Sequence, residues 1–144
     1  MSDSNSTLPP LLRACWIKLN STFQKRLYEL KITPDQYIVL RWLNERTNEQ
    51  TTQSTLANLM YTDANNISAL IIRMENLGFL SRLTNPNERR KKIIQISPKG
   101  IEKFNRARKV ARLLEKQALS GLSENEKVEF NMLLDRLNKF LNGT

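Results

Sequence analysis

The side chains with the clearest chemical purpose are four consecutive cations, Arg89, Arg90, Lys91 and Lys92, inside a longer basic segment. Residues 82–112 hold eleven Lys and Arg against two Glu, while the rest of the 144-residue chain has twelve basic and twelve acidic residues. The whole formal net charge of +9 therefore arises from one segment. Concentrated positive charge attracts polyanions and provides the sequence-independent part of nucleic-acid affinity. The alternative is a basic helix that is merely solvated.

A second group of side chains, polar except for Ala69, precedes this segment at helical spacing and could contact base edges. Asn can pair with adenine, Ser with either kind of hydrogen-bonding group, and Arg with guanine or phosphate. The group consists of Thr62, Asn65, Asn66, Ser68, Ala69 and Arg73. Asp63 is expected to cap the helix, with a contact to cytosine as the minor possibility. The competing interpretation is that Asn65 and Asn66 are solvated residues of a first helical turn.

The composition excludes most catalytic and metal chemistry. There is no His and a single Cys, which removes the commonest general base, the commonest zinc ligand and any internal disulfide. The acidic pair Glu124 and Glu126 belongs to a helix-capping motif. We therefore expect no enzyme activity, no metal and no cofactor. No apolar run approaches the roughly 18 residues needed to cross a bilayer, and no N-terminal targeting segment is evident, so we expect a cytoplasmic protein without a membrane partner.

Apolar spacing predicts the elements that position these residues. A long helix over residues 8–31 is followed by one that begins with Thr33 as its cap and ends near Arg46. A short helix over 52–60 precedes a second helix that ends at Gly78. The apolar stripe of that second helix comprises Ala64, Ile67, Leu70, Ile71, Met74 and Leu77.

The chain then changes to β-branched segments, 79–84 and 93–97, which predict a hairpin with the four cations at its turn. Two long helices follow, one from Ser97-Pro98 to Gly121 and one opened by a capping box at Ser123. The apolar residues expected to face inward on the last helix are Phe130, Leu133, Leu134, Leu137, Phe140 and Leu141.

This order of elements predicts a mainly α chain with a single domain over 1–144. A winged helix-turn-helix over 34–97, with its wing at 79–97, would be embedded in a frame of long helices over 8–31 and 98–142. The frame helices carry more apolar surface than the small winged part can cover, which predicts a homodimer built from them. Lys99, Lys103 and Arg106 place further cations on the helix after the wing, and its first turns are expected to lie near DNA.

Two motifs resemble the MarR (multiple antibiotic resistance regulator) family, and the resemblance extends over essentially the whole chain. Residues 85–100 are similar to the family's wing motif of an acid, any residue, Arg, a short strand, Leu-Thr and Gly, although Glu88 replaces the usual Asp and Ile96-Ser97 replaces Leu-Thr. Residues 71–80 resemble the end of its recognition helix. The resemblance implies a dimeric transcription factor on palindromic operators in double-stranded DNA. Such factors are often repressors and are often released by a small anionic or phenolic ligand.

The resemblance also implies roles for individual residues. Arg90 matches an Arg that enters the minor groove, Glu88 would orient the wing by charge pairing, and Ala69 stands where the family often has a basic residue. An effector pocket would draw on Trp16, Phe23, Tyr37 and Arg41, with Trp42 nearby, and each of these is equally compatible with the core or an interface.

Cys15 invites comparison with the branch of the family that senses hydroperoxides, but it lies about one helical turn from that branch's position. We therefore expect a buried, structural cysteine. Two alternatives remain open at this point. One is a non-specific or architectural nucleic-acid-binding protein without an effector, and the other is a redox-sensing regulator that acts through Cys15.

Overall fold

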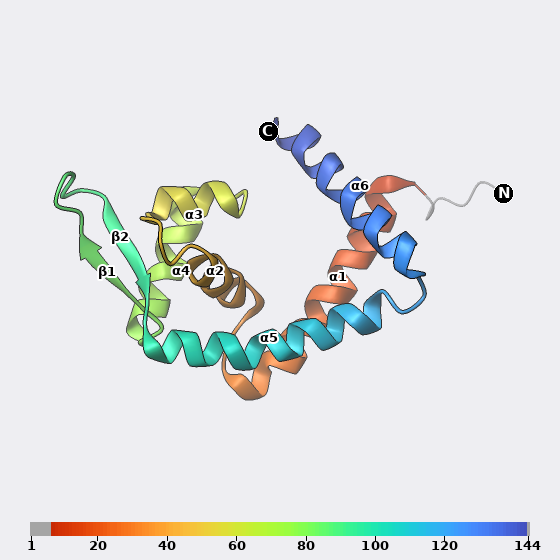
Figure 1. Cartoon of the computed structure of the whole chain (residues 1–144), viewed down its shortest axis with the longest axis horizontal. Helices are drawn as coiled ribbons and strands as arrows, with labels where there is room; N and C mark the ends of the chain where they lie inside the picture. The colour runs from red at the N-terminus through yellow and green to blue at the C-terminus, as the bar shows by residue number, and fades with distance from the viewer. Residues whose placement is uncertain (1–6, 144) are drawn as a thin grey trace. The chain divides into compact units, whose positions relative to one another are not determined.

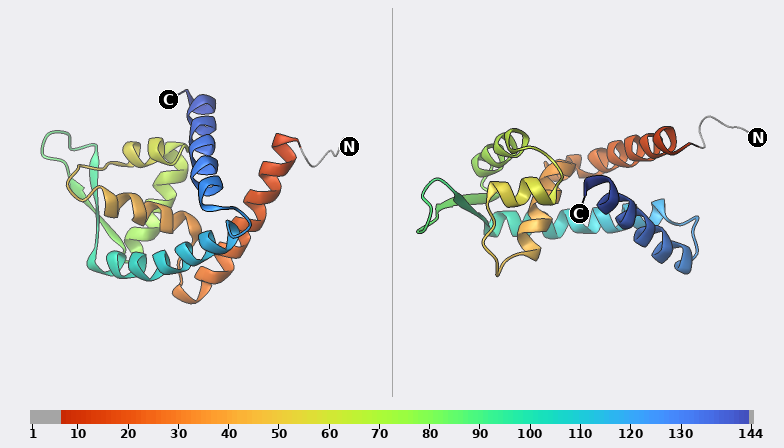
Figure 2. Two further views of the ribbon diagram at one scale, coloured as in Figure 1. Left: turned by 45° about the vertical axis from the view of Figure 1, so that its right-hand side comes forward. Right: turned by 90° about the horizontal axis from the view of Figure 1, so that it is seen from above.

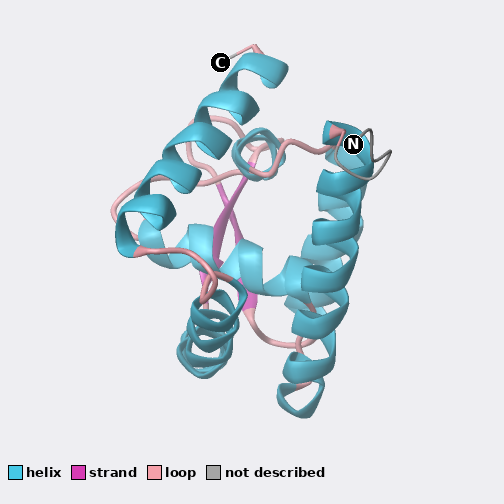
Figure 3. Cartoon of the chain, turned by 90° about the vertical axis from the view of Figure 1, so that its right-hand side faces the viewer, coloured by secondary structure: helices cyan, strands magenta, loops and turns pink. Residues whose placement is uncertain are grey.

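The computed structural model describes residues 7–143 and is mainly helical, with one antiparallel pair of strands (Figures 1 and 3). It forms two compact units, one up to Ala111 and one from Arg112 onward. The elements are α1 (Leu8–Leu27), η2 (Tyr28–Leu30), α2 (Pro34–Glu45), α3 (Gln53–Leu59), α4 (Ala64–Asn76), β1 (Leu80–Thr84), β2 (Lys92–Ile96), α5 (Pro98–Ala118) and α6 (Glu124–Asn142). The predicted element order is confirmed.

Side-chain caps fix where the helices begin. The Thr33 hydroxyl accepts from the Gln36 amide at 3.2 Å, and the Gln36 side chain accepts from the Thr33 amide at 3.1 Å. Ser123 and Glu126 form the same reciprocal pair at the start of α6. Both capping boxes were predicted from sequence and are confirmed. Such caps satisfy amide groups that have no partner inside the helix, so they define helix starts locally.

The core of the first unit joins α1, α2, α4 and α5 around fully buried aliphatic side chains. An aromatic cluster extends this core, with the Phe23 and Tyr37 rings 5.3 Å apart edge to face and the Tyr37 and Phe104 rings stacked at 5.7 Å. Offset and edge-to-face ring pairs add to the energy of apolar burial. The most deeply buried side chains are Leu27, Val39, Leu40, Leu56, Ile67, Ile71 and Met74.

The hairpin of β1 and β2 pairs in a register that runs from Leu80 opposite Ile96 to Thr84 opposite Lys92. Figure 2 shows this hairpin extending beyond the helices of its unit. The sequence did not predict a contact between β2 and the residues before α3: Thr52 forms an isolated antiparallel bridge with Ile93, and the Ile94 amide donates to the carbonyl of the buried Thr51 at 2.7 Å. This contact ties the base of the wing to the start of α3.

Two glycines allow tight junctions around the wing. Gly78 has φ +80°, the left-handed conformation that terminates α4. Gly100 lies at the start of α5, where a Cβ atom would lie 2.1 Å from the Phe79 carbonyl oxygen. The Ser97 hydroxyl donates to the Gly78 carbonyl at 2.5 Å and accepts from the Gly100 amide at 3.0 Å. The end of α4, the start of β1 and the start of α5 are therefore bonded at one point.

Helix α6 buries none of its residues within the single chain: its apolar side chains are exposed, apart from a half-buried Leu137. The physical reason is that the second unit contains only α6 and the end of α5, and two helices cannot enclose an apolar core. This agrees with the expectation that the chain itself cannot cover the apolar surface of its frame helices, and burial of α6 in a dimer stays a prediction. The expectation that Cys15 is buried is wrong: Cys15 is exposed, as are its apolar neighbours Leu12, Trp16 and Leu19 on α1.

Candidate nucleic-acid interface

Helix α4 has one buried side and one exposed side. Its start is fixed by Asp63, whose Oδ1 accepts from the Asn66 amide at 2.8 Å, so the predicted capping role is confirmed. Ile67, Ile71 and Met74 are buried as predicted, and Leu70 is half-buried. Ala64 and Leu77, which were assigned to the same stripe, are exposed because they lie at the two ends of the helix, where its packing stops.

The opposite side carries the residues predicted to contact DNA, all of them polar except Ala69. Asn65, Asn66, Ala69 and Arg73 are exposed there, and Thr62 and Ser68 are half-buried along its border. Within residues 7–143, no side chain forms an ion pair or hydrogen bond with the Arg73 guanidinium. A partner-free guanidinium on an exposed helix face is available to phosphate or to a guanine edge.

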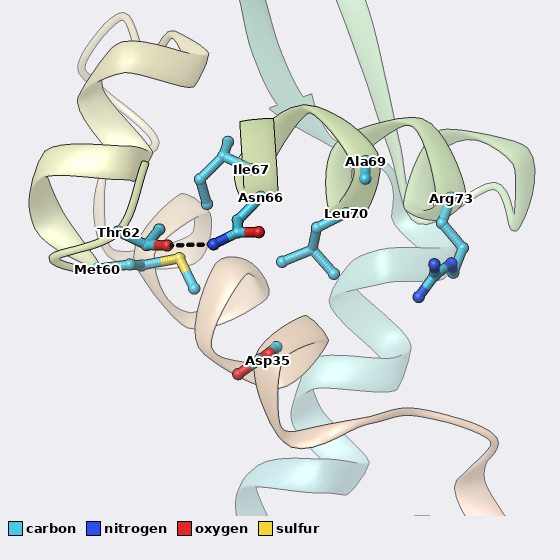
Figure 4. A pocket seen from close by; sticks show the side chains of 8 residues that line it. All are labelled: Asp35, Met60, Thr62, Asn66, Ile67, Ala69, Leu70 and Arg73. Carbon is cyan, nitrogen blue, oxygen red and sulfur yellow. Dashed lines mark hydrogen bonds between the residues drawn. The ribbon is translucent and has the colours of Figure 1, made fainter. Parts of the chain in front are cut away.

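The side-chain amide of Asn66 is already hydrogen-bonded, although the residue is exposed. Its Nδ2 donates to Thr62 Oγ1 at 3.2 Å (Figure 4) and also to Asp63 Oδ2 at 3.3 Å. Bidentate pairing with adenine uses both the amide donor and the carbonyl acceptor. Such pairing would therefore require Asn66 to exchange these two bonds, whereas its carbonyl oxygen can accept a bond without that exchange.

A hollow of about 420 Å³ lies beside this exposed side of α4 (Figure 4). Asp35 of α2 and Met60 after α3 contribute to it, together with Leu70 and Arg73. Sequence alone did not place Asp35 or Met60 at this surface, because only tertiary packing brings the starts of α2 and α4 together.

Two of the four cations of the wing have partners within the hairpin, and two do not. Lys91 pairs with Glu88 at 3.3 Å, and the Lys92 ammonium donates to Thr84 Oγ1 across the hairpin at 3.1 Å. Arg89 and Arg90 are exposed, and nothing in residues 7–143 pairs with either guanidinium. The turn is shaped by a buried Asn85, whose side-chain oxygen accepts from the amide of the residue two positions on. Two of the four cations are therefore available for an external anion.

An ion pair fixes the wing against α4. Arg82 of β1 donates through Nε and Nη2 to Oε1 of Glu75 at 3.2 and 3.0 Å. The hydrogen bonds from Arg82 lower the pKa of the Glu75 carboxyl below its ordinary value. The wing and α4 are thereby held in one orientation within the same unit.

Two basic residues of α5 have structural partners instead of free charges. The Lys99 ammonium donates to the Leu77 carbonyl at 2.9 Å, and the Lys103 ammonium donates to the Leu30 carbonyl at 2.6 Å. Both carbonyls lie at helix C-termini, where cations satisfy groups that the helix leaves unpaired. The ammonium groups of Lys99 and Lys103 are therefore engaged by backbone carbonyls, and the expectation that the first turns of α5 lie near DNA stays a prediction.

The four residues assigned to an effector pocket have different surroundings. Phe23 and Tyr37 pack against each other in the aromatic cluster, while Trp16 is 63% exposed on α1. Arg41 is exposed and donates to Glu45 one turn later on α2 at 3.0 Å. Their role as a ligand site stays a prediction. No helix in residues 7–143 is long and apolar enough to cross a membrane, and the same residues include no cluster of three or more metal-binding side chains.

A helix-turn-helix followed by a cationic β-hairpin defines a DNA-binding winged helix-turn-helix protein. The model of the MarR family matches residues 32–92. The uncharacterized HTH-type transcriptional regulator YybA of Bacillus subtilis (strain 168) is 30% identical over 123 residues, which cover 84% of this chain and 79% of YybA. The chain belongs to the MarR family, as its motifs indicated, and is a DNA-binding transcriptional regulator.

Two solved structures show the same fold. The S. aureus MepR–DNA complex matches with a TM-score of 0.87 at 21% identity, covering 97% of this chain and 99% of that chain. Bordetella bronchiseptica BpsR, whose DNA binding is regulated by 6-hydroxynicotinic acid, matches with a TM-score of 0.86 at 20% identity, covering 96% and 97%. The predicted fold class, mainly α with a winged helix-turn-helix, is confirmed.

Proposed function

We propose that this regulator acts as a homodimer that represses transcription from palindromic operators and is released by a small ligand. The observation that carries the DNA-binding part is the placement of partner-free guanidiniums. Arg73 on α4 and Arg89 and Arg90 on the wing all lie in the first unit, and the Arg82–Glu75 pair links the two elements that bear them. In this arrangement α4 contacts base edges in the major groove, and the wing contacts an adjacent groove or backbone.

The dimer is supported by the apolar surface that single chains leave exposed. Leu8, Leu12 and Trp16 on α1 and Phe130 and Leu134 on α6 are each at least 40% exposed. Apolar side chains at helical spacing on two terminal helices would be costly in water, and a second copy would bury them. A two-fold dimer presents two copies of α4, which matches a palindromic site.

The ligand is proposed to be a small phenolic or anionic molecule. The support is the family to which the chain belongs and the 6-hydroxynicotinic acid that regulates BpsR, a compound with both a ring hydroxyl and a carboxylate. A second candidate, thiol-based regulation, is favoured by one observation, the exposure of Cys15. An exposed thiol is accessible to an oxidant, whereas a buried one is protected.

The proposal is tested in two steps with the full chain. Sedimentation at micromolar concentration should give about twice the 16.8 kDa of one chain. Repeated selection from a pool of random duplexes should then enrich a sequence with two inverted half-sites. A monomer in sedimentation, or enrichment of non-palindromic sites, would contradict the dimeric part of the proposal. The alternative of a non-specific, architectural protein predicts no enrichment at all.

A further inference from the structure

We infer that α4 recognises the 5-methyl group of thymine through Ala69 and Ile72, which would make these two residues determinants of sequence preference. The inference rests on the proposed function, because it requires α4 to lie in the major groove of duplex DNA. It deepens that function by naming the chemical group that is recognised, an apolar methyl group rather than a hydrogen-bonding edge.

The position of Ala69 follows from the side of α4 that is buried. Ile71 and Met74 are fully buried, and 3.6 residues per turn place Ala69 about 160° around the helix from Ile71. Ala69 is therefore near the centre of the exposed side. Because its side chain is a single methyl group, the helix backbone at this position can approach base edges closely.

Ile72 is the neighbour of Ala69 three residues on, so the two lie side by side on the helix surface. Ile72 is apolar but 43% exposed, whereas its neighbours on the same side of α4, Asn65 and Asn76, are polar. Together, Ala69 and Ile72 form a small apolar strip between polar residues. Burial of such a strip against another apolar group is favourable because apolar area leaves water.

Exposed hydrogen-bonding side chains flank the strip at Asn65, Arg73 and Asn76, but the strip itself offers only apolar atoms. The Asn66 amide group already donates to Thr62 and Asp63, and Ser68 is half-buried. In the major groove the apolar group offered by the four bases is the C5-methyl of thymine, and alanine is among the side chains that contact it. The chemistry of the strip therefore matches thymine.

The probe is the duplex that selection enriches most, synthesised with thymine or with uracil at one thymine position at a time. Uracil removes the 5-methyl group and leaves the base pair and its hydrogen-bonding groups unchanged. Loss of one buried methyl should weaken binding about fourfold at each contacted position. At every other thymine position the two forms should bind alike.

Protein variants assign the effect to the strip. The variants Ile72→Ala and Ala69→Ser should each bind the thymine and uracil duplexes equally at the thymine position that the replaced residue contacts. Ile101→Ala is the matched control, because it makes the same change at an isoleucine of α5 with a similar exposed fraction of 39%, and it should keep the fourfold difference.

The outcomes separate this inference from the function on which it rests. If a preferred duplex is enriched but every uracil form binds as tightly as its thymine form, methyl recognition is wrong and sequence-specific binding stands. If uracil weakens binding equally in the wild type and both strip variants, another residue contacts the methyl and the inference is again wrong. If selection enriches no duplex, the proposed function and this inference both fail.

Discussion

Replacing Arg90 by alanine should weaken DNA binding more than replacing Lys92, although both are cations near the tip of the wing. The structure gives the reason. The Arg90 guanidinium has no partner in residues 7–143, whereas the Lys92 ammonium already donates to Thr84 at 3.1 Å. A cation that has no partner in the protein can bind a DNA phosphate, and the counterion condensed on that phosphate is then released. Arginine is also the residue that narrow, A·T-rich minor grooves attract.

The magnitude follows from counterion release. One phosphate contact changes the slope of log affinity against log salt by about 0.9. Between 1 M and 0.15 M salt, this slope corresponds to about a fivefold gain in affinity from that contact. Arg90→Ala should lose at least this factor, and more on A·T-flanked sites because the narrow groove concentrates negative potential. Lys92→Ala should lose less than this, equally on both kinds of site.

The assay is a salt titration of both variants on matched duplexes that differ only in A·T or G·C flanks. Lys91→Ala, which removes the cation paired with Glu88, is a second control for charge at the turn. Equal losses for Arg90→Ala and Lys92→Ala on both duplexes would refute the minor-groove role and leave Arg90 as a phosphate contact.

Four further predictions concern other parts of the molecule. Arg73→Ala should weaken binding by about 1–3 kcal/mol on the preferred duplex and by far less on random DNA. Asn66→Ala should show the same pattern with a smaller loss of binding energy, because its amide group is engaged by Asp63 and Thr62. Equal losses on both DNAs would mean that these residues contact phosphate only. Gly100→Ala should lower the free energy of unfolding by about 1–3 kcal/mol, since its Cβ would lie 2.1 Å from the Phe79 carbonyl, whereas Gly121→Ala, where a Cβ meets nothing within 4 Å, should be neutral in denaturant titration. Glu75→Gln should destabilise the chain at neutral pH. Because the folded-state pKa of Glu75 is lowered, the difference in unfolding free energy between wild type and variant should be present above the carboxyl's ordinary pKa and should vanish as pH falls through the lowered pKa. A difference that persists in acid would exclude the ion pair as its cause. Finally, although Cys15 is exposed, peroxide should not change DNA binding by the wild type or by Cys15→Ser, because Cys15 lies about one helical turn from the position used by the hydroperoxide-sensing branch of the family. Loss of binding in the wild type alone would instead establish thiol-based regulation.

The parts of the fold that sequence predicted well are those fixed by neighbouring residues. Capping boxes at Thr33 and Ser123 and the left-handed Gly78 are short-range signals, and the strands were located to within a residue because alternation and turn residues are local. The contact of the Thr51 carbonyl with β2 and that of Lys103 with the Leu30 carbonyl were missed, because each depends on residues that meet only after folding.

The candidate site divides in the same way. The exposed side of α4 and the cationic turn follow from helical and strand periodicity, so their residues could be named in advance. Which cations are free could not be named, because Lys99 is engaged by a carbonyl 22 residues away. Burial of Cys15 was predicted wrongly, because periodicity identifies an apolar side of a helix but does not identify what covers it.

The most direct test of the account is the ratio of two affinities measured at one salt concentration. The full chain is titrated with the most enriched duplex and with random duplex of equal length at 0.15 M salt. A sequence-specific regulator should bind the enriched duplex at least about a thousandfold more tightly. A ratio near one would contradict the account, because it would mean that the net charge of +9 accounts for the whole of the DNA affinity.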